Sequence, residues 1–145
     1  MDKESIQKGM LSLAQDGFRC SQIMLALGLK RQGKENPDLI RAMGGLIVGV
    51  GYSGKICGAL TGGTCLITLY AGRGRADEKE HPKLWPMVQE FVEWFESEIG
   101  ENKGIIDCDG ILERAGVAKP SSETCGPIVL KSYIKAVSIL EANGL

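Results

Sequence analysis

Residues 44–63 read GGLIVGVGYSGKICGALTGG, and this stretch decides how the rest of the chain can fold. It holds eight of the 20 glycines in a chain of 145 residues, whereas average glycine usage is roughly 7%. Its first half leaves two structures open: Leu46–Val48 fits either a short strand or more helix, and the glycines that follow form a permissive loop. Its second half predicts a helix that begins near Gly58.

The segment 56–72 contains no charged residue and is 17 residues long. A membrane-spanning helix needs about 20 predominantly apolar residues. This segment is interrupted by glycines and threonines and is bounded by Lys55 and Arg73. We therefore expect a buried core helix over about 58–71 and no membrane span.

Amphipathic segments on both sides of this helix predict the rest of the fold. Apolar residues recur at helical spacing, as at Ile6, Met10 and Leu13. Residues 72–83 are densely charged and are typical of a solvated loop. The prediction is an all-α, small single-domain bundle of about five to six helices, with a glycine-rich loop before the central helix. The expected helices span about 3–15, 21–31, 37–43, 58–71, 85–99 and 127–142, with a short helical turn at 110–115.

The charge balance and the N-terminal residues exclude several classes of protein. Lys+Arg is 17 and Asp+Glu is 18, which gives a net charge of −1, whereas nucleic-acid-binding proteins carry a clustered basic excess. The opening residues MDKESIQKGM lack the apolar region and cleavage site of a secretory signal. We therefore expect a cytoplasmic protein, in a reducing compartment where structural disulfides are rare.

Four of the five cysteines fall at or near the start of a predicted helix: Cys20, Cys57, Cys108 and Cys125. Unpaired N–H groups and the helix dipole stabilise a thiolate at such a position. The pKa of these thiols is therefore expected to fall from about 8.5 into or below the physiological range. Because thiolates bind metals and attack disulfides, the pattern predicts one assembled site, with Gly58 allowing close approach. The alternative is that each cysteine fills a small space at a helix start.

The cysteine spacing excludes the common zinc and redox motifs. The intervals between the four are 37, 51 and 17 residues, and no Cys-x-x-Cys occurs, which argues against zinc ribbons and thioredoxin-type sites. Four dispersed cysteines still suffice to ligate an iron–sulfur cluster if they meet in space. Cys65 lies about 12 Å along the helix from Cys57 and is expected to pack in the core. His81, in the charged loop, is expected on the surface.

Two nucleotide-binding patterns overlap in 49–56. Gly49-x-Gly51-x-x-Gly54 has the spacing of the dinucleotide fingerprint, but no alternation of strands and helices surrounds it. The same glycines followed by Lys55 resemble a phosphate loop, but Ile56 stands where Ser or Thr must hold magnesium. We therefore expect a structural loop, or a nest of N–H groups that cradles a thiolate or an anionic cluster.

The order of these motifs resembles that of one known family. Gly17-Phe18-x-Cys20, then Cys57-Gly58-Ala59-x-x-Gly62, then Cys108 and Cys125 follow the pattern Cys…Cys-Gly-Ala-x-x-Gly…Cys…Cys of a family of redox-active proteins. The similarity covers nearly the whole chain. Cys65 has no counterpart in the pattern, and Leu46–Val48 is more aliphatic than the usual glycine-rich run. The resemblance implies a cytoplasmic, bacterial or archaeal, thiol-based redox or metal protein.

One hypothesis and two alternatives follow from these observations. In the first, residues 1–145 form a single domain whose Cys20, Cys57, Cys108 and Cys125 bind an iron–sulfur cluster, or another thiolate-bound metal, and exchange electrons with an unknown redox partner. The alternatives are a metal-free dithiol/disulfide protein and a structural or sensory metal-binding module. Whether the protein is an enzyme stays open. Trp94, which lies off the main apolar face of 85–99, is a candidate for a homodimer surface.

Overall fold

A computed structural model describes residues 2–145 of the protein. Within these residues the chain forms seven α-helices of at least seven residues and no β-strand, which confirms the predicted all-α single-domain fold. The helix count exceeds the predicted five to six because residues 108–115, where only a short turn at 110–115 was expected, form a capped helix. The helices are α1 (Lys3–Gln15), α2 (Cys20–Arg31), α3 (Pro37–Met43), α5 (Gly58–Ala71), α6 (Leu84–Glu98), α7 (Cys108–Ala115) and α8 (Ser122–Ala142), with η1 (Gly44–Leu46) and α4 (Ile47–Val50) as shorter turns.

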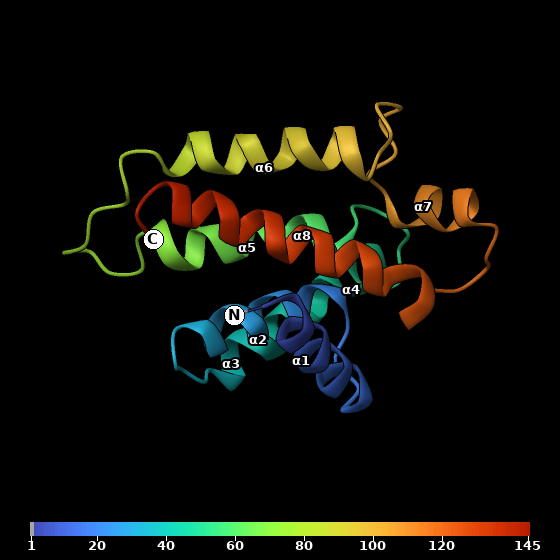
Figure 1. Cartoon of the computed structure of the whole chain (residues 1–145), viewed down its shortest axis with the longest axis horizontal. Coiled ribbons are helices and arrows are strands. Elements are labelled where there is room, and N and C mark those ends of the chain that lie inside the picture. The colour runs from blue at the N-terminus through green and yellow to red at the C-terminus, as the bar shows by residue number, and fades with distance from the viewer. Residues whose placement is uncertain (1) are drawn as a thin grey trace.

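The helix predicted to be central, α5, lies at the centre of the fold. It packs against α2, α8 and α6, and these helices form three layers (Figure 1). The helices α1, α2 and α3 lie below α5 and α8, α6 lies above them, and α7 stands at the end where α8 begins. None of the helices within residues 2–145 is both long and apolar enough to cross a membrane.

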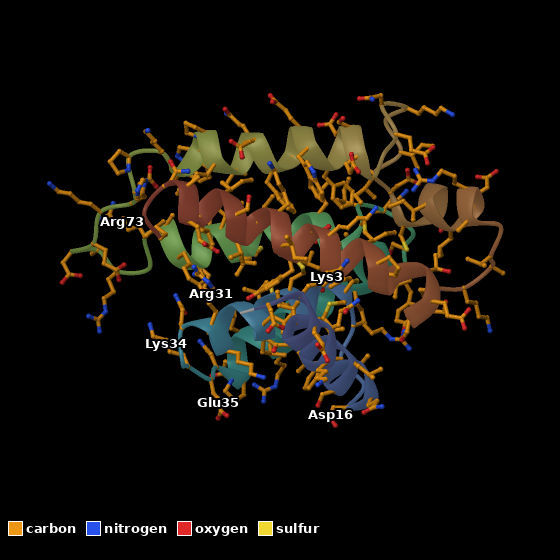
Figure 2. The ribbon with its side chains drawn as sticks, viewed as in Figure 1. Lys3, Asp16, Arg31, Lys34, Glu35 and Arg73 are labelled. Atoms are coloured by element: carbon orange, nitrogen blue, oxygen red, sulfur yellow. The ribbon has the colours of Figure 1, made fainter. Side chains whose placement is uncertain are left out.

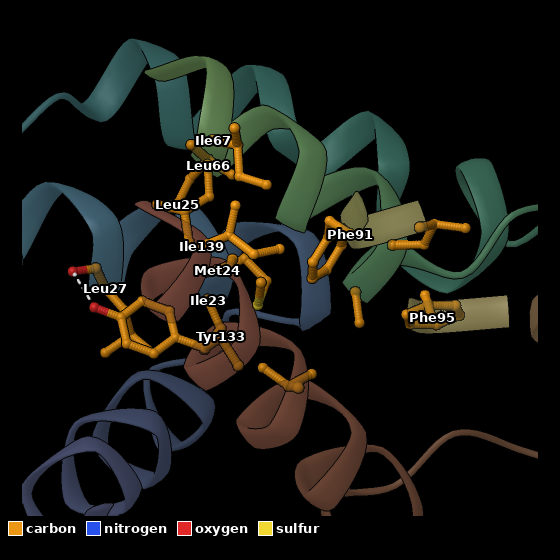
Figure 3. Close-up of a cluster of buried hydrophobic side chains, with 14 of the residues drawn as sticks. Ile23, Met24, Leu25, Leu27, Leu66, Ile67, Phe91, Phe95, Tyr133 and Ile139 are labelled. Carbon is orange, nitrogen blue, oxygen red and sulfur yellow. Dashed lines mark hydrogen bonds between the residues drawn. The ribbon is translucent and has the colours of Figure 1, made fainter. Parts of the chain in front are cut away.

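Small residues on α5 allow its neighbours to pack close to it. A Cβ at Gly63 would overlap the ring of Phe91 on α6, and a Cβ at Gly62 would lie 3.0 Å from Met24 on α2. Phe91, Phe95 and Met24 are fully buried in the resulting core (Figure 3). Burial of each such side chain contributes about 1.5–3 kcal/mol, so these contacts hold α2, α5 and α6 together.

Trp94 is half-buried and packs on its own helix. Its ring centroid lies 5.7 Å from that of Phe91 and 6.4 Å from that of Phe95. Part of the Trp94 ring is therefore buried within the monomer, and a role of Trp94 in a dimer interface stays a prediction.

The predicted start of the last helix is wrong by five residues. The sequence analysis assigned Pro127 to the first helical position, but α8 begins at Ser122. The true start signal is Ser121, whose side chain accepts a hydrogen bond from the Thr124 N–H (3.3 Å). Pro127 is the sixth residue of the helix, where it removes the N–H that would donate to the Glu123 carbonyl. Cys125 is therefore the fourth residue of α8 and does not precede it.

Residues 48–52 form neither of the two structures left open by the sequence. Val48, Gly49, Val50, Gly51 and Tyr52 all have a positive φ, between 50° and 67°. The Gly51 and Tyr52 N–H groups both donate to the Ile47 carbonyl, at 2.8 and 3.3 Å. The segment is therefore a single left-handed helical turn. Such a turn costs about 1–2 kcal/mol for each residue that carries a Cβ, so the surrounding structure must hold it in place.

Candidate thiol site

A short backbone pairing joins the glycine loop to the segment before α7. Ile56 and Asp107 form an isolated antiparallel bridge. The Cys57 N–H donates to the Ile106 carbonyl (2.9 Å), and the Cys108 N–H donates to the Lys55 carbonyl (2.6 Å). This pairing fixes Cys57 and Cys108 on neighbouring segments, although 51 residues separate them in the sequence.

Each of the four predicted cysteines lies in the first turn of a helix or caps one. Cys20 is the first residue of α2, Cys57 is the N-cap of α5, and Cys108 is the first residue of α7. Cys125 is the fourth residue of α8, and its N–H donates to the Ser121 carbonyl (2.8 Å). All four are free thiols.

The four cysteines line one cavity of about 560 Å³. It opens between α1, α2, α7 and the first half of α8, and most of its other lining residues are apolar. Val48 of the left-handed turn and Ile111 of α7 are part of the wall. The structure therefore brings the four predicted site residues together, and their role as ligands stays a prediction.

Two glycines let the backbone approach these thiols. A Cβ at Gly58 would overlap the Sγ of Cys20 and would lie 3.2 Å from the Ser21 nitrogen. A Cβ at Gly49 would lie 2.8 Å from the Cβ of Cys108. Gly58 was predicted as a site residue, and the overlap explains why a side chain does not fit there. Gly49 also requires its positive φ of 67°.

The expected fall in thiol pKa is wrong for Cys57, Cys108 and Cys125. Burial raises the pKa of Cys57 to about 12, and the amides of Ala59 and Leu60 at the start of α5 only partly oppose it. Burial likewise raises the pKa of Cys108 to about 11 and is the largest cause of a raised pKa at Cys125. A helix N-terminus favours a thiolate, but removal of water from an uncompensated charge is the larger effect here.

The thiols also influence one another. Ionised Cys20 raises the pKa of Cys57, of Cys108 and of Cys125, in each case after the larger contribution of burial. Arg19, in the cavity wall, acts in the opposite direction on Cys125. Four neighbouring thiols with one nearby guanidinium cannot all ionise unless further positive charge is supplied.

A single metal ion does not fit the positions of these side chains. Sulfurs bound to one tetrahedral ion at about 2.3 Å lie roughly 3.8 Å from one another. Within residues 2–145, no group of three or more Cys, His, Asp or Glu side chains is close enough to hold an ion.

The remaining candidate residues lie outside the cavity. Cys65 lies in the middle of α5, is half-buried against the core, and does not line the site. The His81 N–H donates to the Ala71 carbonyl (2.8 Å), and its Nδ1 accepts from the Lys83 N–H (3.0 Å), so His81 shapes the 72–83 loop. Gly49 and Gly51 lie within the left-handed turn at 48–52, and no strand precedes them, so neither nucleotide-binding pattern has its structural context.

Sequence reasoning missed several residues of the wall. Val48 and the face of α1 that includes Met10 and Leu11 line the cavity. No motif marks Val48, because its position depends on the left-handed turn. For α1 the sequence does carry a signal. Leu11 lies beside the main apolar stripe of that helix, and an apolar residue at such a position indicates that the helix contacts or lines a second surface.

Comparison with known proteins agrees with this arrangement of cysteines. Searches of curated proteins and of solved structures found no match to the chain. Residues 18–139 match the model of one protein family. The matched range includes all four cysteines of the cavity. The pattern ascribed to the family above is wrong at two positions: the family pattern has Gly-Cys-Ala-x-x-Gly, whereas this chain has Cys57-Gly58-Ala59, with the glycine after the cysteine. The chain belongs to the family described as "Putative redox-active protein (C_GCAxxG_C_C)".

Proposed function

We propose that this protein is a cytoplasmic electron carrier that holds an iron–sulfur cluster on Cys20, Cys57, Cys108 and Cys125. The observation that carries the proposal is that these four thiols, and no other cysteine within residues 2–145, line one largely apolar cavity. Membership of a redox-active family supports the redox part of the proposal.

The raised thiol pKa values favour a metal cluster over disulfide exchange. A thiol with a pKa of about 12, such as Cys57, has almost no thiolate near neutral pH, and the thiolate is the attacking form. A bound cation supplies the missing positive charge and deprotonates a coordinating thiol outright. Burial that makes these thiols poor nucleophiles is therefore compatible with their being ligands.

The donor set favours a cluster over a single ion. The donors are thiols alone, and iron–sulfur clusters are held by cysteine thiolates. A cluster has several metal atoms and so keeps its ligand sulfurs farther apart than one ion does. This agrees with four sulfurs around one cavity that form no single-ion site within residues 2–145.

The protein's own residues would hold the cluster and limit its contact with water. When bound, the cluster supplies reversible one-electron transfer. The apolar wall, with Val48 and Ile111, restricts water, and solvent exposure is one of the factors that set a cluster's potential. Gly58 and Gly49 keep the backbone close to Cys20 and Cys108.

The test is metal and sulfide analysis of protein purified without oxygen, with a visible spectrum. We expect iron, acid-labile sulfide and a broad visible absorbance. Cys→Ser substitution at position 20, 57, 108 or 125 should remove most of the iron. Cys65→Ser is the matched control, because Cys65 is half-buried but outside the cavity, and it should retain the full iron content.

Other outcomes would favour the alternatives. Colourless protein with four titratable thiols and no metal would overturn the cluster and favour dithiol/disulfide chemistry. A metal without sulfide, whose chelation unfolds the protein, would instead indicate a structural or sensory metal-binding module.

A further inference from the structure

The cavity extends beyond the cysteines as a groove between α1 and α8. One wall is a stripe of α1 that includes Lys3, Gln7 and Leu11, and the other is a stripe of α8 that includes Lys131 and Ile134. Figure 2 places Lys3 next to the α8 ribbon and Asp16, just past the other end of α1, away from it. The proposed cluster requires only the cysteine end of the cavity, so the groove between α1 and α8 has no assigned role.

The charged residues that line the cavity are all cationic. They are Lys3, Arg19 and Lys131, and no carboxylate lines it within the described part of the chain. The chain as a whole has 17 basic and 18 acidic residues, so a lining of one sign is a local feature. A cavity with only positive charge favours an anionic ligand over a cationic one.

Exposed apolar side chains complete the groove. Leu11 is 56% exposed and Ile134 is 38% exposed, and both line the cavity. The whole cavity, with its cysteine end included, has a volume of about 560 Å³, and small-molecule sites of this size are mostly apolar with a few polar groups that orient the ligand. Apolar walls next to lysine side chains match a molecule with an apolar body and one acidic group.

We propose that the groove between α1 and α8 binds a free organic acid, with its hydrocarbon body against Leu11 and Ile134 and its carboxylate near Lys3 and Lys131. This inference goes beyond the proposed electron-transfer function and does not rest on it, because the residues that carry it are not cysteines. The ligand class is a medium-chain aliphatic or aromatic carboxylate.

The test is calorimetric titration of the full chain, as purified and under reducing conditions, with decanoate below its micelle concentration. We expect saturable binding of one decanoate, and weak or no binding of decyltrimethylammonium, which has the same chain length and the opposite charge. The double variant K3Q/K131Q should weaken decanoate binding by about threefold to tenfold, the range for two exposed charge interactions.

The matched control is Lys135→Gln. Lys135 lies one turn after Lys131 on α8, pairs with Glu90 of α6 (3.7 Å), and does not line the cavity, so this variant should bind decanoate like the parent protein. Ile134→Asp should abolish binding by placing a negative charge at the exposed edge of the groove. Its fold is checked by circular dichroism.

Three results would overturn the proposal: no saturable decanoate binding, equal binding of the ammonium compound, or unchanged affinity in K3Q/K131Q. Binding to anionic phosphatidylglycerol vesicles without binding of free decanoate would also overturn it, because the surface would then recognise a membrane. Iron content is measured on the same samples, so loss of the cluster hypothesis and loss of the ligand hypothesis are separate outcomes.

Discussion

Gly58 follows Cys57 in the chain and lies against the sulfur of Cys20. For Gly58→Ala we expect the free energy of unfolding to fall by about 1–3 kcal/mol, because the new methyl group overlaps the sulfur in a packed region. We also expect loss of the bound iron. Urea unfolding and iron analysis of the variant test both effects.

Substitution of Gly126 is the control for Gly58→Ala. It lies next to Cys125 in α8, and a Cβ there would meet nothing within 4 Å. Gly126→Ala should therefore keep the iron and change the free energy of unfolding by less than about 1 kcal/mol, because the gain of alanine over glycine in a helix is opposed by contact of the new Cβ with the next residue, Pro127. Equal behaviour of the two variants would contradict the close approach of Gly58 to Cys20.

The thiols give a prediction about pH for the reduced, metal-free protein. Below pH 9 the Cys57 thiol is neutral in both the folded and the unfolded chain. Between the unfolded pKa of 9.0 and the folded pKa of about 12 only the unfolded chain ionises, so stability should decline as pH rises through this interval. Alkylation of the Cys57 peptide, followed by mass spectrometry, should accelerate about tenfold per pH unit up to pH 10. A plateau below pH 9 would show that the thiol is not desolvated.

At the scale of elements, the left-handed turn carries a strain that one substitution should relieve. Val50 has a φ of 65° and is 42% exposed, so it loses less packing on truncation than a core valine does. Val50→Gly should raise the free energy of unfolding by about 0.5–1 kcal/mol, the difference between the strain of a left-handed residue and the entropy of glycine. Chemical denaturation measures this gain.

Substitution of the neighbouring residue, Gly51, should change stability in the opposite direction. Gly51 has a φ of 61°, and a Cβ there would meet only the Gly45 carbonyl at 3.7 Å. Gly51→Ala should therefore lower the free energy of unfolding by about 1 kcal/mol through backbone strain alone. Stabilisation by Gly51→Ala would mean that the turn is not left-handed in solution.

The same elements show which parts of the fold the sequence could predict. Helices α1, α2, α3, α5 and α6 begin and end within about one residue of the prediction, because apolar spacing and end signals agree there. The predicted start of α8 is wrong because a proline is a more conspicuous sequence signal for a helix start than a serine such as Ser121. The turn at 48–52 was missed because Val48 and Val50 adopt a conformation that sequence rules reserve for glycine.

The candidate site could be predicted in its residues but not in its electrostatics. The position of Cys20, Cys57 and Cys108 at helix starts could be read from the pattern, and the structure places them around one cavity with Cys125. Their pKa shifts depend on how much water the folded chain excludes, which is a property of tertiary packing. The sign of the shift therefore could not be obtained from sequence.

At the scale of the whole molecule, the site lies at the edge of the core, where Cys20 and Cys57 pack against it. The buried core joins α2, α5, α6 and α8, whereas the cysteines lie where the 49–57 and 104–108 segments meet the helix starts. Removal of iron by a chelator should therefore leave the helix content and a cooperative unfolding transition, while hydrogen exchange becomes faster in these two segments. Loss of helical circular dichroism on chelation would contradict the prediction, because it would show that the core needs the bound metal.

The backbone pairing of Ile56 with Asp107 has a consequence for how the chain can be divided. A break in the exposed loop at about residue 76 would leave Cys20 and Cys57 on one piece and Cys108 and Cys125 on the other. Neither piece alone would contain a complete set of thiols, while the contacts of α5 with α6 and α8 would favour their reassociation. The protein is thus a candidate for a two-fragment reporter, in which visible colour appears only when the halves are brought together.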